Sequence, residues 1–263
     1  MSDALLIRRE GAVLVLSNNN PAARNALSPE FYAAVTTALA DAAADAGVGA
    51  VVLTGEGGHF CAGGDLRQLA RRRELPVEQR REKLEGLHDL IRAVRDCSKP
   101  VIAAVEGAAA GAGLSLALAC DMLVAARDSL FSVAYVKVGL TPDGGATAFL
   151  AEFVSRQVLT ELCLTGERIS GERMHALGPV NRLAEPGQAL VDAIALAAQI
   201  ATGPDQAMAL IKDLCRRAPR NTLEQQLELE AQHMVNSQGS EESREGIAAF
   251  LEKRSADSTK LRA

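Results

Sequence analysis

The sequence lacks the patterns of a membrane-spanning or exported protein. Its longest uncharged apolar run, residues 107–120, is rich in glycine and too short to span a bilayer. Residues 1–10 carry acidic and basic side chains early and contain no apolar signal-peptide core. We therefore expect a cytoplasmic protein with no membrane partner.

Signatures of a bound metal, nucleotide or nucleic acid are also missing. The four histidines show no HExxH or paired spacing, so no metal site is expected. No Walker A lysine follows a glycine loop, and Gly111–Gly113 lacks the third glycine of a dinucleotide fingerprint. The net charge of −5 gives no electrostatic reason to expect nucleic-acid binding. The five scattered cysteines form no CxxC pair, which favours reduced core residues over disulfides.

Apolar residues make up 48% of the chain, which is enough for a large core in one or two domains. Strand-like runs alternate with helical patterns, and this alternation predicts an α/β fold. We expect strands at 12–16, 51–53, 101–105, 122–125 and 180–183. We expect helices over about 29–46, capped by Ser28, and over much of 68–94, with a break at Pro76.

The C-terminal part of the chain has a different pattern. No strand signal remains from residue 187 onward, and helices are expected at about 188–202, 204–217, 223–237 and 241–254. This change predicts an α/β core over residues 1–200 and a helical region over residues 201–263. The last residues, 255–263, are expected to form a loose tail.

Two glycine-rich turns carry most of the information about function. In KPVIAAVEGAAAGAGLSLALACD, residues 99–121, a buried strand leads through glycines into a helix whose pattern continues to Met122. An amide at Ala112 or Gly113 would lie at the positive end of that helix, free to bind an anion or a polarised carbonyl. Another strand runs into FCAGGDL, residues 60–66, so the two turns can form a clamp of two amides. A tight strand-to-helix joint is the alternative.

Both turns resemble the oxyanion-hole segments of the enoyl-CoA hydratase/isomerase (crotonase) family, and the resemblance spans nearly the whole chain. It also includes NNNPAARNALS (18–28), FSVAYVKVGLTPDGGAT (131–147), LTGERISGERMHALGPVNRL (164–183) and EGIAAFLEKR (245–254). The resemblance implies a spiral of repeated ββα units with a C-terminal helical region that assembles trimers, often paired as hexamers. It further implies an acyl-CoA thioester substrate, in which coenzyme A is part of the substrate and no separate cofactor is needed.

The resemblance also implies the chemistry, which is stabilisation of an enolate at the thioester carbonyl by two backbone N–H groups. By position these are the amides of Gly64 and Ala112. Loss of one such donor typically costs roughly 2.7 to 4 kcal/mol of barrier. Many relatives have glycine where this chain has Ala112, so φ at Ala112 must be negative for the amide to act.

The chain departs from the family's hydratase pattern at the acid/base groups. Hydratases use two glutamates, and the matching positions here are Ser115 and Tyr135, neither of which is a carboxylate base. Asp143, in GLTPDGGAT, resembles the single catalytic aspartate of isomerases of aromatic catabolism and of 4-chlorobenzoyl-CoA dehalogenases. Those dehalogenases carry a tryptophan at the position of Tyr135, and this chain contains none, which disfavours that reaction.

Several of these residues also have a structural interpretation. Asp143 could cap a helix expected at 146–154, and Ser115 could cap a helix turn. Tyr135 could hydrogen-bond the acyl group or fill the space of a glutamate. His59 is a weak candidate base, because a residue before the turn is expected to point away from the acyl group.

Further residues are implied in coenzyme A binding by the resemblance. They are Arg24, Ala26, Ala62, Gly63, Asp65, Leu66 and, from a neighbouring subunit, Phe250 and Lys253. Asp65 is also expected to cap the helix that follows it. The run Arg71, Arg72 and Arg73 could attract phosphates, although such a run is more typical of a solvated helix face.

The leading hypothesis is an isomerase-type acyl-CoA enzyme with Asp143 as its acid/base group and the Gly64 and Ala112 amides as its oxyanion hole. One alternative is hydration or ring-opening hydrolysis of an unsaturated or cyclic acyl-CoA, with Asp143 directing water. The other is a catalytically silent scaffold that binds coenzyme A.

Overall fold

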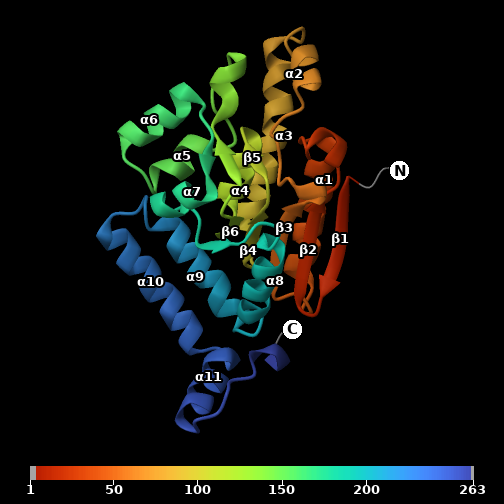
Figure 1. Cartoon of the computed structure of the whole chain (residues 1–263). Coiled ribbons are helices and arrows are strands. Elements are labelled where there is room, and N and C mark those ends of the chain that lie inside the picture. The colour runs from red at the N-terminus through yellow and green to blue at the C-terminus, as the bar shows by residue number, and fades with distance from the viewer. Residues whose placement is uncertain (1–3, 262–263) are drawn as a thin grey trace.

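The computed structural model describes residues 4–261, which form a mixed α/β fold (Figure 1). The larger sheet has the strand order β1-β2-β3-β4-β6-β9. In it β1 (Leu5–Glu10) pairs antiparallel with β2 (Val13–Asn18), and every other pairing is parallel. The remaining strands are β3 (Ala50–Gly55), β4 (Val101–Val105), β6 (Met122–Ala126) and β9 (Arg182–Ala184). The predicted α/β class is confirmed.

A smaller sheet contains β5 (Ala108–Ala110), β7 (Leu130–Ser132) and β8 (Ile169–Ser170). β5 follows β4 and β7 follows β6, so each of these chain segments places one strand in each sheet. A helical segment comes next in both cases: α4 (Ala112–Ala119) after β5 and the 3-10 helix η3 (Ala134–Val138) after β7. The chain therefore repeats a ββα unit, as expected.

Both faces of the larger sheet are covered, which explains why its central strands are apolar throughout. Alternate residues of β4 point to opposite faces. Val101, Ala103 and Val105 belong to the core that also contains side chains of α1 (Pro29–Ala44) and α3 (Val77–Asp96). Ile102 and Ala104 pack with residues of α8 (Ala189–Ile200) on the other face.

Helix boundaries follow the predicted start signals. The Ser28 side chain accepts a hydrogen bond from the Phe31 amide at 3.3 Å, and Pro29 occupies the first turn of α1. Pro76 separates α2 (Leu66–Arg72) from α3, as predicted. The other helices before α8 are η1 (Pro21–Ala23), η2 (Glu56–Gly58), α5 (Ala146–Ala151), α6 (Arg156–Thr165) and α7 (Gly171–Leu177).

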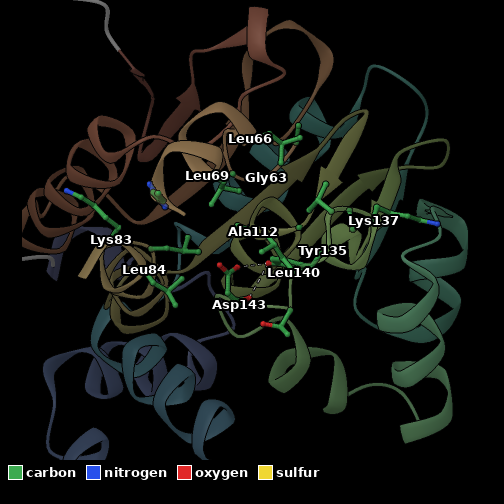
Figure 2. Close-up of a pocket in the computed structure, with 18 of the residues that line it drawn as sticks. Gly63, Leu66, Leu69, Lys83, Leu84, Ala112, Tyr135, Lys137, Leu140 and Asp143 are labelled. Carbon is green, nitrogen blue, oxygen red and sulfur yellow. Dashed lines mark hydrogen bonds between the residues drawn. The ribbon is translucent and has the colours of Figure 1, made fainter. Parts of the chain in front are cut away.

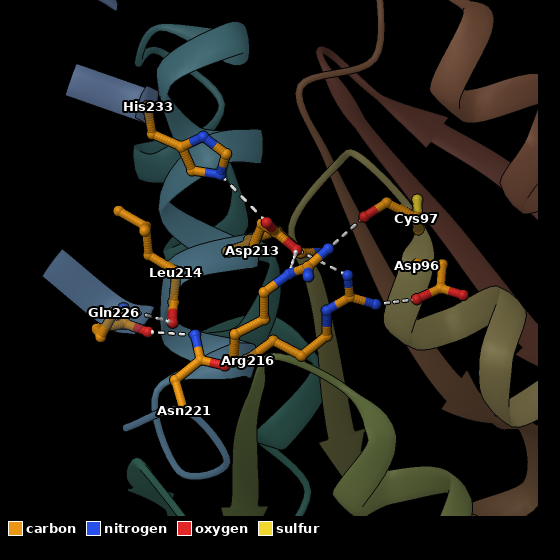
Figure 3. Close-up of polar contacts among 10 residues, drawn as sticks. Asp96, Cys97, Asp213, Leu214, Arg216, Asn221, Gln226 and His233 are labelled. Carbon is orange, nitrogen blue, oxygen red and sulfur yellow. Dashed lines mark hydrogen bonds and ion pairs between the residues drawn. The ribbon is translucent and has the colours of Figure 1, made fainter. Parts of the chain in front are cut away.

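The C-terminal helices α9 (Asp205–Arg217), α10 (Leu223–Gln238) and α11 (Glu241–Leu251) extend from the α/β body, and α11 lies at the opposite end of the molecule from α2 (Figure 1). α9 is held to the body by polar contacts (Figure 3). Lys212 donates to the carbonyls of Cys97 and Lys99 at 2.8 and 2.7 Å. Arg216 forms an ion pair with Asp96 at the end of α3.

Several expectations about elements were wrong. β1 was not predicted, because it is an edge strand in which Leu5 alone is buried, and its exposed residues hide the strand pattern. The helix was also expected to continue to Met122, but α4 ends at Ala119. Beyond this end, the Asp121 carboxylate accepts a hydrogen bond from the Val101 amide of β4 at 2.7 Å.

The expected loose tail is also partly wrong. Ser258–Leu261 form the 3-10 helix η4, in which Ser258 is buried, while residues 262 and 263 lie outside the described residues. Two predicted helices end early: α5 at Ala151 and α11 at Leu251, beyond which Lys253 has a positive φ of 56°. A positive φ is incompatible with helix continuation in an L residue.

Candidate active site

The two glycine-rich turns meet beside the smaller sheet. The Cys61 amide donates to the Ala108 carbonyl at 2.9 Å, and the Ala110 amide donates back to the Cys61 carbonyl at 3.0 Å. Gly63 has φ of +99°, and a Cβ atom there would lie 2.7 Å from the Ala110 carbonyl oxygen. Glycine is therefore required at 63 both for the backbone angle and for the close approach of the turns.

Both residues predicted to supply an amide donor line one cavity. Gly64 and Ala112 lie in its wall, and Ala112 is the first residue of α4, where a backbone N–H has no partner within the helix. Neither amide donates to a backbone carbonyl in the turns and loops of residues 4–261. Ala112 is absent from the non-glycine residues with positive φ, so its side chain imposes no strain on the turn.

Asn25 anchors this arrangement, and the sequence analysis did not single it out. It is fully buried with φ of 58°, and its side-chain amide donates to the carbonyls of Glu56 and His59 at 2.8 and 2.6 Å. The neighbouring Arg24 carbonyl accepts from the Ala62 amide at 2.9 Å. Asparagine tolerates positive φ better than most residues, which is the signal that could have identified it.

The cavity has a volume of about 400 Å³, within the range of small-molecule sites. Its walls are mostly apolar and come from the two glycine-rich turns, α1, α2, α3, η3 and the segment after η3 (Figure 2). Asp143 is the only carboxylate among the described residues that line it. The Asp143 side chain points toward Tyr135 and lies near Ala112 (Figure 2).

Asp143 is fixed by hydroxyl groups. The Tyr135 hydroxyl donates to Asp143 Oδ1 at 2.7 Å, and the Ser115 hydroxyl donates to the Asp143 backbone carbonyl at 2.8 Å. The Ser115 and Tyr135 oxygens lie 3.2 Å apart. The helix-capping alternatives are therefore wrong for both residues: α5 has no side-chain cap, and Ser115 bonds across to Asp143.

Burial controls the acid–base properties of this pair. Desolvation raises the pKa of Asp143 above its ordinary value, while the hydrogen bond from Tyr135 and the charges of His88 and Arg72 lower it in part. Burial and the negative charge of Asp143 also raise the pKa of Tyr135, which keeps the phenol protonated as a donor. A carboxyl group with a raised pKa in a cavity can both accept and return a proton near neutral pH.

A second hollow of about 780 Å³ adjoins the first, and the two share Ala62, Ala134 and Lys137. Arg24, Lys137 and Arg168 line this hollow together with Asp128 and Glu167, so it offers three cationic groups to a phosphate beside two carboxylates. His59 lies here rather than in the first cavity, and its Nδ1 accepts from the Ala108 amide at 3.3 Å.

The other predicted binding residues are more dispersed. Gly63 and Leu66 line the first cavity and Ala62 lines both, whereas Ala26 and Asp65 are absent from both linings. Asp65 caps α2 as predicted, since its carboxylate accepts from the Arg67 amide at 2.8 Å. Phe250 is 83% exposed on α11, and Lys253 follows that helix, so this chain alone does not bring either to the cavity.

The described residues contain no group of three or more side chains arranged to hold a metal ion. No helix among them is long and apolar enough to cross a bilayer. The five cysteines are free, and Cys61, Cys97 and Cys120 are buried as expected, whereas Cys215 is exposed.

Comparison with known proteins supplies the context for this geometry. A family model described as enoyl-CoA hydratase/isomerase matches residues 8–260. The chain belongs to the enoyl-CoA hydratase/isomerase family. Enzymes of this family act on acyl-CoA thioesters, and the family's crotonase-like fold is confirmed by a solved structure. That structure, an enoyl-CoA hydratase from Polaromonas sp. JS666, superposes with a TM-score of 0.94 at 48% identity, covering 96% of this chain and 98% of the other.

Relatives within the enoyl-CoA hydratase/isomerase family differ in their reactions. A 1,2-epoxyphenylacetyl-CoA isomerase of Escherichia coli is 35% identical, over 98% of this chain and 99% of the relative. A 2,3-dehydroadipyl-CoA hydratase of the same organism is 32% identical, over 96% and 97%. Family membership therefore establishes the enzyme class, and the reaction must be argued from the site.

Proposed function

We propose that this protein is an isomerase-type acyl-CoA enzyme with Asp143 as its single acid/base group. One observation carries the proposal: Asp143 is the only carboxylate among the described residues that line the cavity containing the Gly64 and Ala112 amides. One carboxylate is sufficient to move one proton between two carbons, whereas the family's hydratase route uses two.

The thioester oxygen binds between the Gly64 and Ala112 amides, which stabilise the negative charge that develops on it. Asp143 removes a proton from one carbon of the acyl group, and the electron pair of that C–H bond passes into the conjugated enolate. Asp143 then returns the proton to a different carbon, so the double bond moves and the carboxylate is regenerated. No water or separate cofactor is consumed.

Tyr135 supports this cycle by holding one carboxylate oxygen, Oδ1, at 2.7 Å. No described residue hydrogen-bonds to the other oxygen, Oδ2, which leaves it for the substrate carbon. The second hollow, with Arg24, Lys137 and Arg168, receives the phosphates of coenzyme A. Phe250 and Lys253 complete that site from a neighbouring subunit of a trimer or a hexamer.

Similarity to a 1,2-epoxyphenylacetyl-CoA isomerase supports the hypothesis that this protein is an isomerase. Similarity to a 2,3-dehydroadipyl-CoA hydratase keeps hydration, with Asp143 directing water, as the second candidate. The two reactions differ in where solvent atoms enter the product. An isomerase exchanges only carbon-bound hydrogen with heavy water, whereas a hydratase adds a hydroxyl group.

The deciding experiment measures turnover of crotonyl-CoA, a 3-enoyl-CoA and an epoxyphenylacetyl-CoA by the native protein and by Asp143→Asn. We expect a double-bond shift or ring isomerisation in the native protein and a loss of about 10²- to 10⁴-fold in the variant. Asp89→Asn, on the exposed side of α3, is the matched control and should retain full activity. Efficient hydration of crotonyl-CoA that survives Asp143→Asn would contradict the proposal.

A further inference from the structure

Arg72 occupies an unusual place in the cavity wall. It is the last residue of α2 and lines the cavity, whereas its neighbours Arg71 and Arg73 are exposed. The solvated-face interpretation of this arginine run is therefore wrong for Arg72. Its half-buried guanidinium forms no hydrogen bond or ion pair with any described residue.

Tyr32 lies in the same wall and comes from α1. Its hydroxyl forms no hydrogen bond with another described residue. Burial raises the pKa of Tyr32 to about 12, and the positive charge of Arg72 lowers it in part. Both residues line the same cavity. Leu69, Leu84 and Leu87 make the surrounding wall apolar. Removing a polar group from water without giving it a hydrogen-bond partner costs free energy. A ligand that pairs with Arg72 and Tyr32 would recover this free energy.

Asp143 does not serve as the partner of Arg72. The charge of Arg72 lowers the pKa of Asp143, but the two side chains form no ion pair, and Asp143 is bonded to Tyr135 instead. The other cationic residues of the wall have different positions. Lys83 and Lys137 both point away from Asp143 (Figure 2), and Lys137 also lines the second hollow.

We propose that the acyl group of the substrate carries a second carboxylate, which pairs with the Arg72 guanidinium and accepts a hydrogen bond from Tyr32. The substrate class is then the mono-CoA thioester of a dicarboxylic acid. A guanidinium binds a carboxylate through two parallel hydrogen bonds, which fixes the orientation of the acyl chain as well as its charge. The inference rests on the proposed function only in placing the acyl group in this cavity.

The test measures binding by calorimetry with saturated thioesters, which have no double bond and undergo no isomerisation. Succinyl-, adipyl- and suberyl-CoA are compared with monocarboxylic acyl-CoA esters of equal length and with the methyl ester of adipyl-CoA. We expect at least one dicarboxylic thioester to bind at least about tenfold more tightly than its uncharged counterparts. Arg72→Gln should abolish this preference, and Tyr32→Phe should weaken it.

Arg71→Gln is the matched control, because Arg71 is exposed on the same helix, and it should keep the preference. Unchanged affinity of Arg72→Gln for hexanoyl-CoA would show that the variant is folded and that only the charged contact is lost. Equal binding of charged and uncharged thioesters by the native protein, or a preference that survives Arg72→Gln, would overturn the inference. Either result leaves the Asp143 chemistry standing, whereas a native protein that binds no acyl-CoA would overturn both proposals.

Discussion

Asp143 and Tyr135 form a pair in which each side chain sets the protonation of the other. Because the base must be a carboxylate, activity should rise with pH as Asp143 loses its proton. The Tyr135 hydrogen bond favours the charged form and lowers the pKa of Asp143 against the effect of burial. We expect Tyr135→Phe to move the midpoint of the acidic limb of the kcat profile to higher pH.

The measurement is kcat against pH for the native protein and the variant, with partial recovery of the variant's rate at high pH. A purely structural role for Tyr135 would lower kcat equally at every pH. A midpoint displaced to lower pH would show that the hydroxyl does not stabilise the carboxylate.

Gly113 keeps the two amide-bearing turns in contact. A Cβ atom there would lie 2.4 Å from the Cys61 carbonyl oxygen and 2.8 Å from Cys61 Cβ. We expect Gly113→Ala to push the turns apart, misplace the Ala112 amide and lower kcat by about 10²-fold, the typical effect of losing one oxyanion donor. Gly246→Ala is the control, since nothing lies within 4 Å of its added Cβ. Unchanged kcat in Gly113→Ala would exclude this packing requirement.

At the scale of elements, Lys212 is one of the cations that hold α9 to the α/β body, and it is partly buried. Lys212 pairs with the Asp121 carboxylate at 2.6 Å and also donates to the carbonyls of Cys97 and Lys99. We expect Lys212→Met to lower the free energy of unfolding by about 1–3 kcal/mol, because it removes a partly buried ion pair and two hydrogen bonds from a charged donor. Chemical denaturation would measure the loss. Asp121→Asn in the same background should recover part of it, and no recovery would contradict the pairing.

α9 and α10 are also linked through Asp213, as Figure 3 shows. Desolvation acts to raise the pKa of Asp213, but hydrogen bonds from Arg217, Arg216 and His233 lower it well below its ordinary value. A carboxyl group whose pKa is lowered by folding stabilises the protein above its unfolded pKa, and this stability is lost as pH falls through the folded pKa. The contacts of Asp213 that join α9 to α10 should therefore weaken only in strong acid, where the Asp213 carboxylate becomes protonated.

At the scale of the whole molecule, the C-terminal helices expose an apolar surface. Its largest members on α10 and α11 are Leu223, Met234, Val235, Ile247, Phe250 and Leu251, each at least 60% exposed. Large apolar side chains exposed along two successive helices are typical of an interaction surface. Together with the family resemblance, these side chains support assembly into a trimer or hexamer. The boundary at residue 200 between an α/β core and a helical region stays a prediction.

We expect light scattering during gel filtration to give the mass of a trimer or hexamer. Val235→Asp should shift the mass toward the single chain, because a buried aspartate at the interface would lack a partner. Val77→Asp, an exposed apolar position at the start of α3, is the matched control and should leave the mass unchanged. A native protein that elutes as a single chain would contradict the assembly.

The sequence by itself determined the elements with strong periodic or punctuation signals. The β-branched run at β4, the Ser28-Pro29 start of α1 and the break at Pro76 act locally, so they could be predicted without any tertiary contact. The glycine pattern also predicted two tight turns, and Gly63 and Gly113 are the positions at which the backbones approach closely. The assignment of Gly64 and Ala112 as oxyanion donors comes from the family resemblance and stays a prediction.

Only the tertiary structure decided which side chains face one another. Tyr135 and Asp143 are eight positions apart with no helical or strand register between them, and their hydrogen bond depends on how η3 and the following loop fold over α4. Asn25 and Arg72 acquire their positions in the same way, from contacts between segments distant in the chain. Such pairings are set by packing of the whole core, and periodicity reports only which face of one element is buried.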